Sequence, residues 1–212
     1  MGKHKVGRTP FREACNRLHN DKILEVVPHR GYFVPELTFR GFGDMFEVRF
    51  IIEGAIAEIA SLRATPAQVA ELDRIADRFS PDSPSALDTD QVISLNKEFH
   101  LCLARMTQND ELIELESKIL ERTERLMYIE CRRSGHPTPL FSELHKAVVN
   151  AVRGGDAAAA RRAVLEDITQ SQIRSSVFRL PGEDRDSEHT NTLAAHLSAP
   201  TVAKRQGKGR KV

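Results

Sequence analysis

The sequence predicts a mostly helical protein, in which a short helix and a β-hairpin are followed by an all-α antiparallel helical bundle. Three observations support this fold class. Residues 8–34 contain a short apolar stripe at helical spacing and then two β-rich runs around a glycine. Apolar residues then recur three and four positions apart through residues 44–178, and strand-like alternation ends at residue 35.

Composition places the chain among globular proteins. It has 212 residues, of which 40% are hydrophobic and 29% charged, enough for one medium domain and a small one. The net charge of +1 does not by itself indicate binding to nucleic acid. Residues 3–17 and 204–211, however, are clearly basic. Apolar runs of membrane-spanning length are absent, and three cysteines without a Cys-x-x-Cys pair favour the reducing cytoplasm. We therefore predict a cytoplasmic protein that has no membrane partner.

Residues 8–20 form the first predicted helix. Thr9 is a good N-cap and Pro10 a good first helical residue. Arg8 and Arg12 lie one turn apart on one face. A short helix with arginines near its N-terminus suits entry into a DNA major groove, although solvated arginines on a surface helix are the commoner interpretation of two such residues.

Two β-rich runs follow, at residues 23–28 and 32–34, and they flank a turn that contains Gly31. This pattern is typical of a β-hairpin. A helix followed by a hairpin is the second half of a winged helix-turn-helix. Residues 1–35 are therefore predicted to be a partial winged helix-turn-helix DNA-binding domain.

The motifs Arg-Thr-Pro-x-Arg-Glu-Ala and Pro-x-Arg-Gly-x-Phe-Val, within residues 7–14 and 24–34, resemble the recognition helix and wing of GntR-family transcription regulators. The resemblance implies binding to double-stranded operator DNA. The residues that it implies as DNA contacts are Arg8, Thr9, Arg12, Arg30 and Gly31.

That family's DNA-binding domain begins with two further helices, which the six residues before Gly7 are too few to form. The sequence therefore predicts a start site placed too late, a truncated chain, or a regulator that has lost part of its domain. Under the last alternative the protein is a ligand-binding or dimerisation module without DNA binding.

Gly41 and Gly43 disfavour a helix, so residues 36–43 are predicted to be a linker. Residues 44–178 then form the helical domain. Its helices are expected at about 44–60, 66–79, 87–107, 109–133, 138–153 and 156–178. Residues 179–212 lack an apolar period and are predicted to be a disordered basic tail, with a short helix around 193–197 as an alternative.

Candidate metal ligands fall on three of these helices. Asn96 and His100 are four apart and share one helical face, while His145 and Asp167 lie on two later helices. Three helices that offer two imidazoles, an amide and a carboxylate to one point can form a metal pocket inside a bundle. Spacing alone does not bring them together.

Residues 46–53, 96–112 and 143–160 carry a resemblance to the FCD effector domain of the FadR subfamily, which extends over about 37–178. Many members bind a divalent metal through an aspartate and three histidines. The resemblance implies the ligand set Asn96, His100, His145 and Asp167 here.

This mixed nitrogen and oxygen set fits Zn, Ni, Mn or Fe(II). Asp90 or His136 replaces a ligand if the alignment shifts locally. Two alternatives remain open: hydrogen-bonded core imidazoles, and a polar pocket that holds the effector without metal.

Arg49 lies on the first helix of the domain, at a position that faces the domain interior in the family that the sequence resembles. It is predicted to pair with a carboxylate of a small effector. A buried salt bridge to Glu53 or another acid is the alternative. Arg132 and Arg133 are weaker candidates, because they fit helix-end surface charges equally well.

The sequence thus predicts a ligand-responsive transcription regulator that acts as a homodimer on a palindromic operator. An enzyme is the less favoured alternative. A metal held by His100, His145 and Asp167 can activate water, but no motif places a base beside them.

Overall fold

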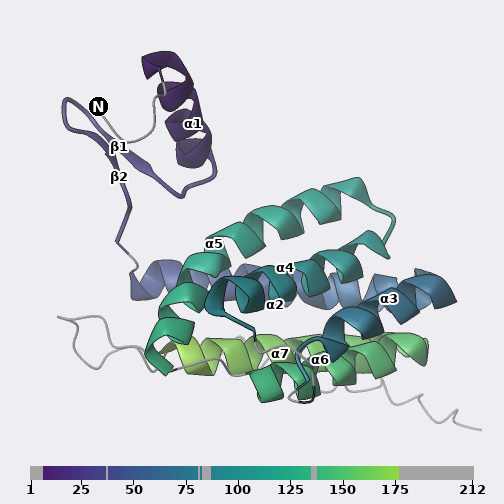
Figure 1. The fold of residues 1–212 in the computed structure, drawn as a ribbon. Coiled ribbons are helices and arrows are strands. Elements are labelled where there is room, and N and C mark those ends of the chain that lie inside the picture. Colours follow the sequence, from purple (N-terminus) through teal and green to yellow (C-terminus); the bar gives the residue numbers. More distant parts are fainter. Residues whose placement is uncertain (1–6, 37, 81, 83–86, 135–137, 177–212) are drawn as a thin grey trace, which may run out of the picture.

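The computed structural model describes residues 7–36, 38–80, 82, 87–134 and 138–176. The chain begins with α1 (Arg8–Asn20), β1 (Glu25–Val27) and β2 (Gly31–Phe33), and six helices follow (Figure 1). They are α2 (Phe39–Arg63), α3 (Pro66–Asp77), α4 (Thr89–Arg105), α5 (Asp110–Ser134), α6 (Thr138–Arg153) and α7 (Ala157–Ser176). The six helices predicted between residues 44 and 178 are all present, whereas the predicted tail at 179–212, with its alternative helix at 193–197, lies outside the described residues.

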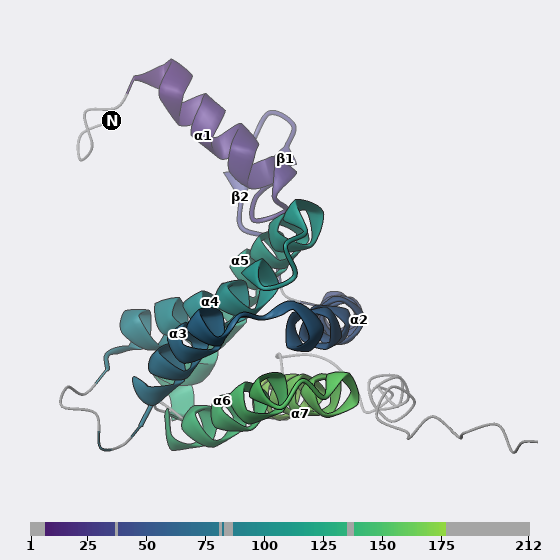
Figure 2. The ribbon, with the colours of Figure 1, turned by 90° about the vertical axis from the view of Figure 1, so that its right-hand side faces the viewer.

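The predicted hairpin is confirmed. β1 and β2 are antiparallel, with Glu25 opposite Phe33 and Val27 opposite Gly31. The Tyr32 hydroxyl donates to Oδ1 of Asn16 at 2.7 Å and so ties the hairpin to α1. Figures 1 and 2 show these three elements together at one end of the helical bundle.

The predicted cap of the first helix is wrong. α1 begins at Arg8 with Gly7 as its N-cap, and no side chain makes a cap hydrogen bond. Thr9 and Pro10 therefore lie inside the first turn. Pro10 fits there because the first four backbone N–H groups of a helix have no partner within the helix.

The predicted linker at residues 36–43 is also wrong in its second half, because α2 already begins at Phe39. The Thr38 hydroxyl accepts a hydrogen bond from the Gly41 backbone N–H at 3.1 Å. Each glycine costs a helix about 1 kcal/mol relative to alanine. Burial of Phe46, whose ring lies 4.7 Å from that of Phe42, more than offsets this cost.

Local caps explain where several later helices start. Thr65 and Gln68 form a capping box at the start of α3, and Asp88 and Gln91 form one at the start of α4. Asp156 accepts from the Ala159 N–H at the start of α7. These signals are contained within four residues, which is why the approximate starts of these helices could be predicted from the sequence.

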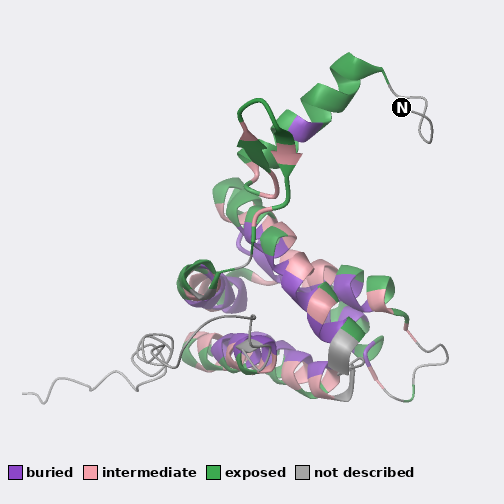
Figure 3. Cartoon of the chain, turned by 90° about the vertical axis from the view of Figure 1, so that its left-hand side faces the viewer, coloured by how far each residue is buried: buried purple, intermediate pink, exposed green. Residues whose placement is uncertain are grey.

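The bundle packs α2 along α7, α7 along α6, α4 along α5, and α3 against both α4 and α6 (Figure 2). Buried residues line the inner faces of these helices, whereas α1 and the hairpin are almost entirely exposed (Figure 3). The core includes Phe46, Phe50, Ile56, Leu72, Ile75, Phe79, Leu95, Phe99, Leu103, Val148, Val164 and Ile168. In the described part of the chain, no helix combines the length and apolar character required to cross a bilayer.

Candidate functional site

Two histidines and an aspartate meet inside the bundle, each from a different helix. His100 comes from α4, His145 from α6 and Asp167 from α7. Nε2 of His100 lies 3.4 Å from Oδ2 of Asp167, and Nε2 of His145 lies 3.9 Å from Oδ1 of the same carboxylate. The structure thus supplies the convergence that sequence spacing alone did not.

His145 lies among aromatic rings. It stacks on Phe99 with ring centroids 3.9 Å apart, and Phe79 and Phe141 contact its other sides. The side chain is fully buried, and neither ring nitrogen has a hydrogen-bond partner among the described residues. Burial, and then the positive charges of His100 and Arg174, lower its pKa well below the usual value. The imidazole is therefore neutral, which is the form that ligates metals.

The three side chains lie slightly farther apart than the ligands of one bound divalent metal. Two nitrogen or oxygen ligands about 2.1 Å from one ion lie roughly 3.0–3.4 Å from each other. The ligand atoms of His100, His145 and Asp167 all lie within 4.8 Å of one another, and all three residues are buried. Nε2 of His100 and both ring nitrogens of His145 have no hydrogen-bond partner among the described residues. A bound cation would satisfy one nitrogen of each histidine.

Of the other predicted metal ligands, only Asn96 is buried in the described part of the chain. Asn96 is buried on α4, and its amide nitrogen donates to the Met127 sulfur at 3.5 Å. Asp90 is exposed in the first turn of α4 and does not share the burial of the cluster. His136 lies outside the described residues, as does the side chain of Arg133, and Arg132 stacks over the exposed Tyr128 ring at 5.8 Å.

Arg49 forms the buried salt bridge that the sequence left as an alternative. Its Nε donates to Oε1 of Glu53 at 2.5 Å, and both side chains are 2% exposed. The other oxygen of Glu53 lies 3.0 Å from Nδ1 of His100. Burial raises the pKa of Glu53, but Arg49 and His100 outweigh it and lower that pKa to about 2. A charged Glu53 thus faces the ring nitrogen of His100 that points away from Asp167.

Glu116 on α5 completes a second buried group with Glu53 and His100, and sequence reasoning missed it. Both of its carboxylate oxygens lack a hydrogen-bond partner in the described residues. Burial, and then the charge of Glu53, raise the pKa of Glu116 well above its usual value. The sequence does indicate that Glu116 is buried, because it falls in the apolar stripe of its helix, three positions before Ile119 and four before Leu120.

The predicted DNA contacts all lie on the surface of α1 and the hairpin. Arg8, Thr9 and Arg12 are exposed on the first two turns of α1. Arg30 is exposed in the hairpin turn and stacks over the Phe33 ring at 5.4 Å. Gly31 has a φ of 107°, which side-chain-bearing residues rarely adopt, so the turn itself requires a glycine there.

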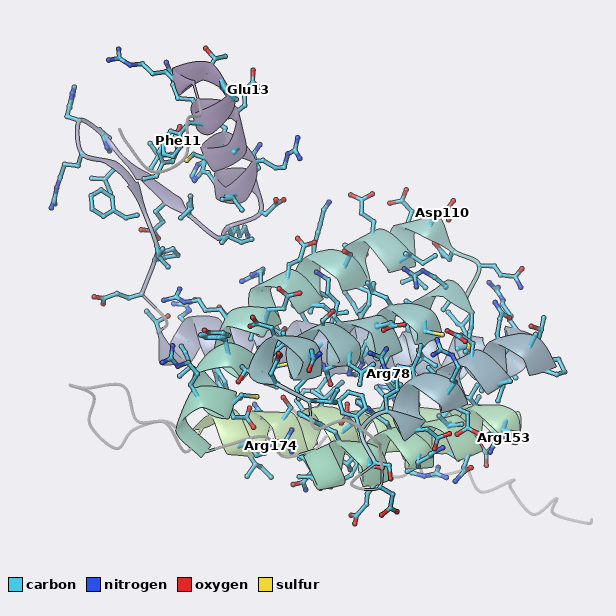
Figure 4. The ribbon with its side chains drawn as sticks, in the orientation of Figure 1. Phe11, Glu13, Arg78, Asp110, Arg153 and Arg174 are labelled. Carbon is cyan, nitrogen blue, oxygen red and sulfur yellow. The ribbon has the colours of Figure 1, made fainter. Side chains whose placement is uncertain are left out.

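The same helix also exposes apolar surface. Phe11 is 57% exposed and Leu18 is 38% exposed. Figure 4 shows Phe11 and Glu13 on different sides of α1, with Phe11 on the side of the hairpin. Exposed arginines beside exposed apolar residues indicate a surface that contacts other molecules.

Comparison with known proteins agrees with this architecture. The FCD domain family model matches residues 44–170. The "Nta operon transcriptional regulator" of Aminobacter aminovorans is 31% identical over 134 residues, which cover 62% of this chain and 63% of that protein. The "Uxu operon regulator" of Haemophilus influenzae is 28% identical over 187 residues, which cover 81% of this chain and 69% of that protein. The chain thus spans less than two thirds of the first relative and slightly more of the second.

Solved structures share the fold. Escherichia coli McbR/YncC superposes with a TM-score of 0.71 at 20% identity, over 81% of each chain. A GntR family member from Pseudomonas syringae has a TM-score of 0.58 at 20% identity, over 81% of this chain and 70% of that one. At 20% identity these structures show the shared fold. The FCD match over residues 44–170, with the named relatives, leads to the assignment: the chain belongs to the FCD-domain transcription regulators of the GntR family.

Proposed function

We propose that this regulator senses a small carboxylate through a divalent metal in its helical domain, and that α1 and the hairpin bind operator DNA. The observation that carries the sensing role is the buried meeting of His100, His145 and Asp167 from three helices. A site at which three helices converge is suited to signalling, because a ligand there changes how those helices pack.

The ligands of the metal would be His100, His145 and Asp167, with Asn96 as the fourth candidate. A bound Zn, Ni, Mn or Fe(II) ion supplies a Lewis acid that attracts an effector carboxylate or hydroxyl. Glu53 supports this assignment, because a carboxylate beside the second nitrogen of a ligating histidine fixes its tautomer and orientation. The buried site thus has both candidate ligands and a residue that orients one of them.

Arg49 is the proposed effector contact nearest this orienting carboxylate. Its guanidinium is held through Nε by Glu53 and is fully buried. Arginine can bind one carboxylate along its Nε edge and a second at its terminal nitrogens. We therefore propose that the effector approaches the terminal nitrogens of Arg49 and leaves the pair with Glu53 intact.

DNA binding is proposed through Arg8, Thr9, Arg12, Arg30 and Gly31. Their exposure on adjacent elements supports this role, because the helix and the hairpin turn are tied together by Tyr32 and Asn16. The helix would enter the major groove while the turn reaches the phosphates beside it.

A homodimer is proposed through α2. Val48, Ile51 and Leu62 are 43%, 55% and 71% exposed, and they recur along one side of the helix. The occupant that suits this apolar stripe is the same stripe of a second copy, because a two-fold axis matches a palindromic operator. Ile51→Asp is expected to give monomers in sedimentation velocity, whereas Glu111→Ala, which removes an exposed side chain from α5, is expected to leave the dimer. A dimer in both variants places the interface elsewhere.

The DNA role is tested by fluorescence anisotropy on the DNA upstream of the gene, over a salt series. The 212-residue chain is compared with a chain extended upstream in the same reading frame. Specific binding whose affinity falls with salt supports the regulator, since phosphate contacts release counterions. If neither chain prefers that DNA over a scrambled duplex, the helical domain is a ligand-binding or dimerisation module.

A further inference from the structure

Arg174 lies near the end of α7, and only one of its three guanidinium nitrogens has a hydrogen-bond partner among the described residues (labelled in Figure 4). Its Nε donates to Oε1 of Glu130 at 2.7 Å. The terminal nitrogens Nη1 and Nη2 are buried, yet neither has a hydrogen-bond partner among the described residues. Buried donors are nearly always hydrogen-bonded, so two unpaired donors on one guanidinium indicate a binding site for an acceptor.

The neighbouring acid is already occupied. The second oxygen of Glu130 accepts a hydrogen bond from the Ser175 hydroxyl at 3.2 Å, and Glu130 itself is 2% exposed. The ion pair with Glu130 therefore holds Nε of Arg174 and leaves Nη1 and Nη2 available to a ligand. The guanidinium also lies over the Phe141 ring, 4.9 Å from the centroid. A guanidinium fixed in this way is prepared for two parallel hydrogen bonds to one carboxylate.

This guanidinium belongs to the same side of the bundle interior as the candidate metal ligands. Arg174 follows Asp167 by seven residues, which is two helical turns on one face and about 10 Å along the axis. Helical side chains generally lean towards the start of their helix, which for Arg174 is the direction of Asp167. The Phe141 ring that it covers lies 5.8 Å from the His145 ring and nearly parallel to it. Arg174 is thus separated from His145 by a single ring.

We propose that Arg174 binds the second carboxylate of the effector, so that the effector is a short dicarboxylate. This inference rests on the proposed function. One carboxylate would lie at His100, His145 and Asp167, and the other would accept hydrogen bonds from Nη1 and Nη2 of Arg174. A short effector is expected, because Arg174 and Asp167 are only two turns apart on one face of α7. A monocarboxylate would leave the guanidinium without its partner.

The test uses the full chain loaded with Zn²⁺ and isothermal titration calorimetry. Succinate is compared with butyrate, and glutarate with valerate, so that each pair differs by one carboxylate at equal length. The unaltered protein is expected to bind the dicarboxylate at least tenfold more tightly. Arg174→Gln should abolish that preference and leave the monocarboxylate affinity unchanged. Arg162→Gln, which removes an exposed arginine from the same helix, should keep the preference.

Zinc content is measured on the same samples, which separates this inference from the proposed function. Loss of zinc from the unaltered protein, with a dicarboxylate preference that still depends on Arg174, overturns the metal site alone. Retained zinc with no dicarboxylate preference, or with a preference that survives in Arg174→Gln, overturns the role of Arg174. Should Arg174→Gln not fold, Arg174→Lys keeps the charge but not the paired donors, and the preference should still fall.

Discussion

The bundle and the N-terminal elements place their charges in opposite ways. The bundle buries Arg49, Glu53, His100 and Asp167 at its centre, where each ionisable side chain needs a partner. Among residues 7–36, by contrast, Cys15 is the only buried side chain. In the bundle, charged side chains pair with one another and stabilise the interior. At the N-terminus, the exposed charged side chains are free to contact another molecule. Substitutions in the two regions should therefore differ in what they affect: stability and metal retention in the bundle, and DNA binding at the N-terminus.

Arg49→Met should cause the largest loss of stability, about 3–5 kcal/mol in urea unfolding, because it leaves Glu53 buried without its cation. The double variant Arg49→Met/Glu53→Leu should recover most of that loss. Arg74→Met removes an ion pair between residues three apart in one helix, whose members are 59% and 47% exposed, and it should leave the unfolding midpoint unchanged. Equal losses for Arg49 and Arg74 would contradict the contrast between buried and exposed pairs.

His145→Phe should reduce metal retention at least tenfold while the fold persists. Phenylalanine keeps an aromatic ring against Phe99 but removes both ring nitrogens. His145→Ala should lose metal similarly and also destabilise the core through a cavity. Metal analysis after dialysis, with His19→Ala on α1 as control, provides the measurement. Unchanged metal content in both His145 variants would remove this residue from the ligand set.

Arg12→Ala should weaken operator binding by about tenfold and reduce the slope of log affinity against log salt by about one, if the contact is to a phosphate. Loss of a base contact would instead lower affinity mainly for the specific site. The unfolding curve of the bundle should not move, since Arg12 is exposed on α1. Arg40→Ala, an exposed arginine on α2, is the matched control for DNA binding.

Asp73→Asn should have the smallest effect, about 0.5 kcal/mol at neutral pH, because the pairs are partly exposed. Asp73 joins α3 to α6 through Lys146 and Arg153, and the hydrogen bond from Lys146 is the main reason that its pKa is lowered. A lowered folded-state pKa stabilises the protein above the ordinary pKa of aspartate. The difference between the two proteins should therefore disappear as pH falls through the lowered pKa. A difference that grows in acid would contradict this assignment.

Much of the fold was predictable because helix signals are local. The capping boxes of Thr65 and Asp88 and the break at Gly155 each act within about one turn. The start of α2 was missed for a non-local reason. Gly41 and Gly43 weaken a helix locally, but Phe46 and Phe50 are buried by partners that lie far along the chain.

Local patterns along the chain specify the succession of elements and the residue types that each helix turns inwards. The tertiary structure alone decided which of those residues meet. His100, His145 and Asp167 lie on helices whose crossing is set by packing across the core, and no spacing along the chain encodes it. Glu116 and Arg174 acquired their significance in the same way, because a buried acid or guanidinium becomes a candidate site only when its surroundings leave it unpaired.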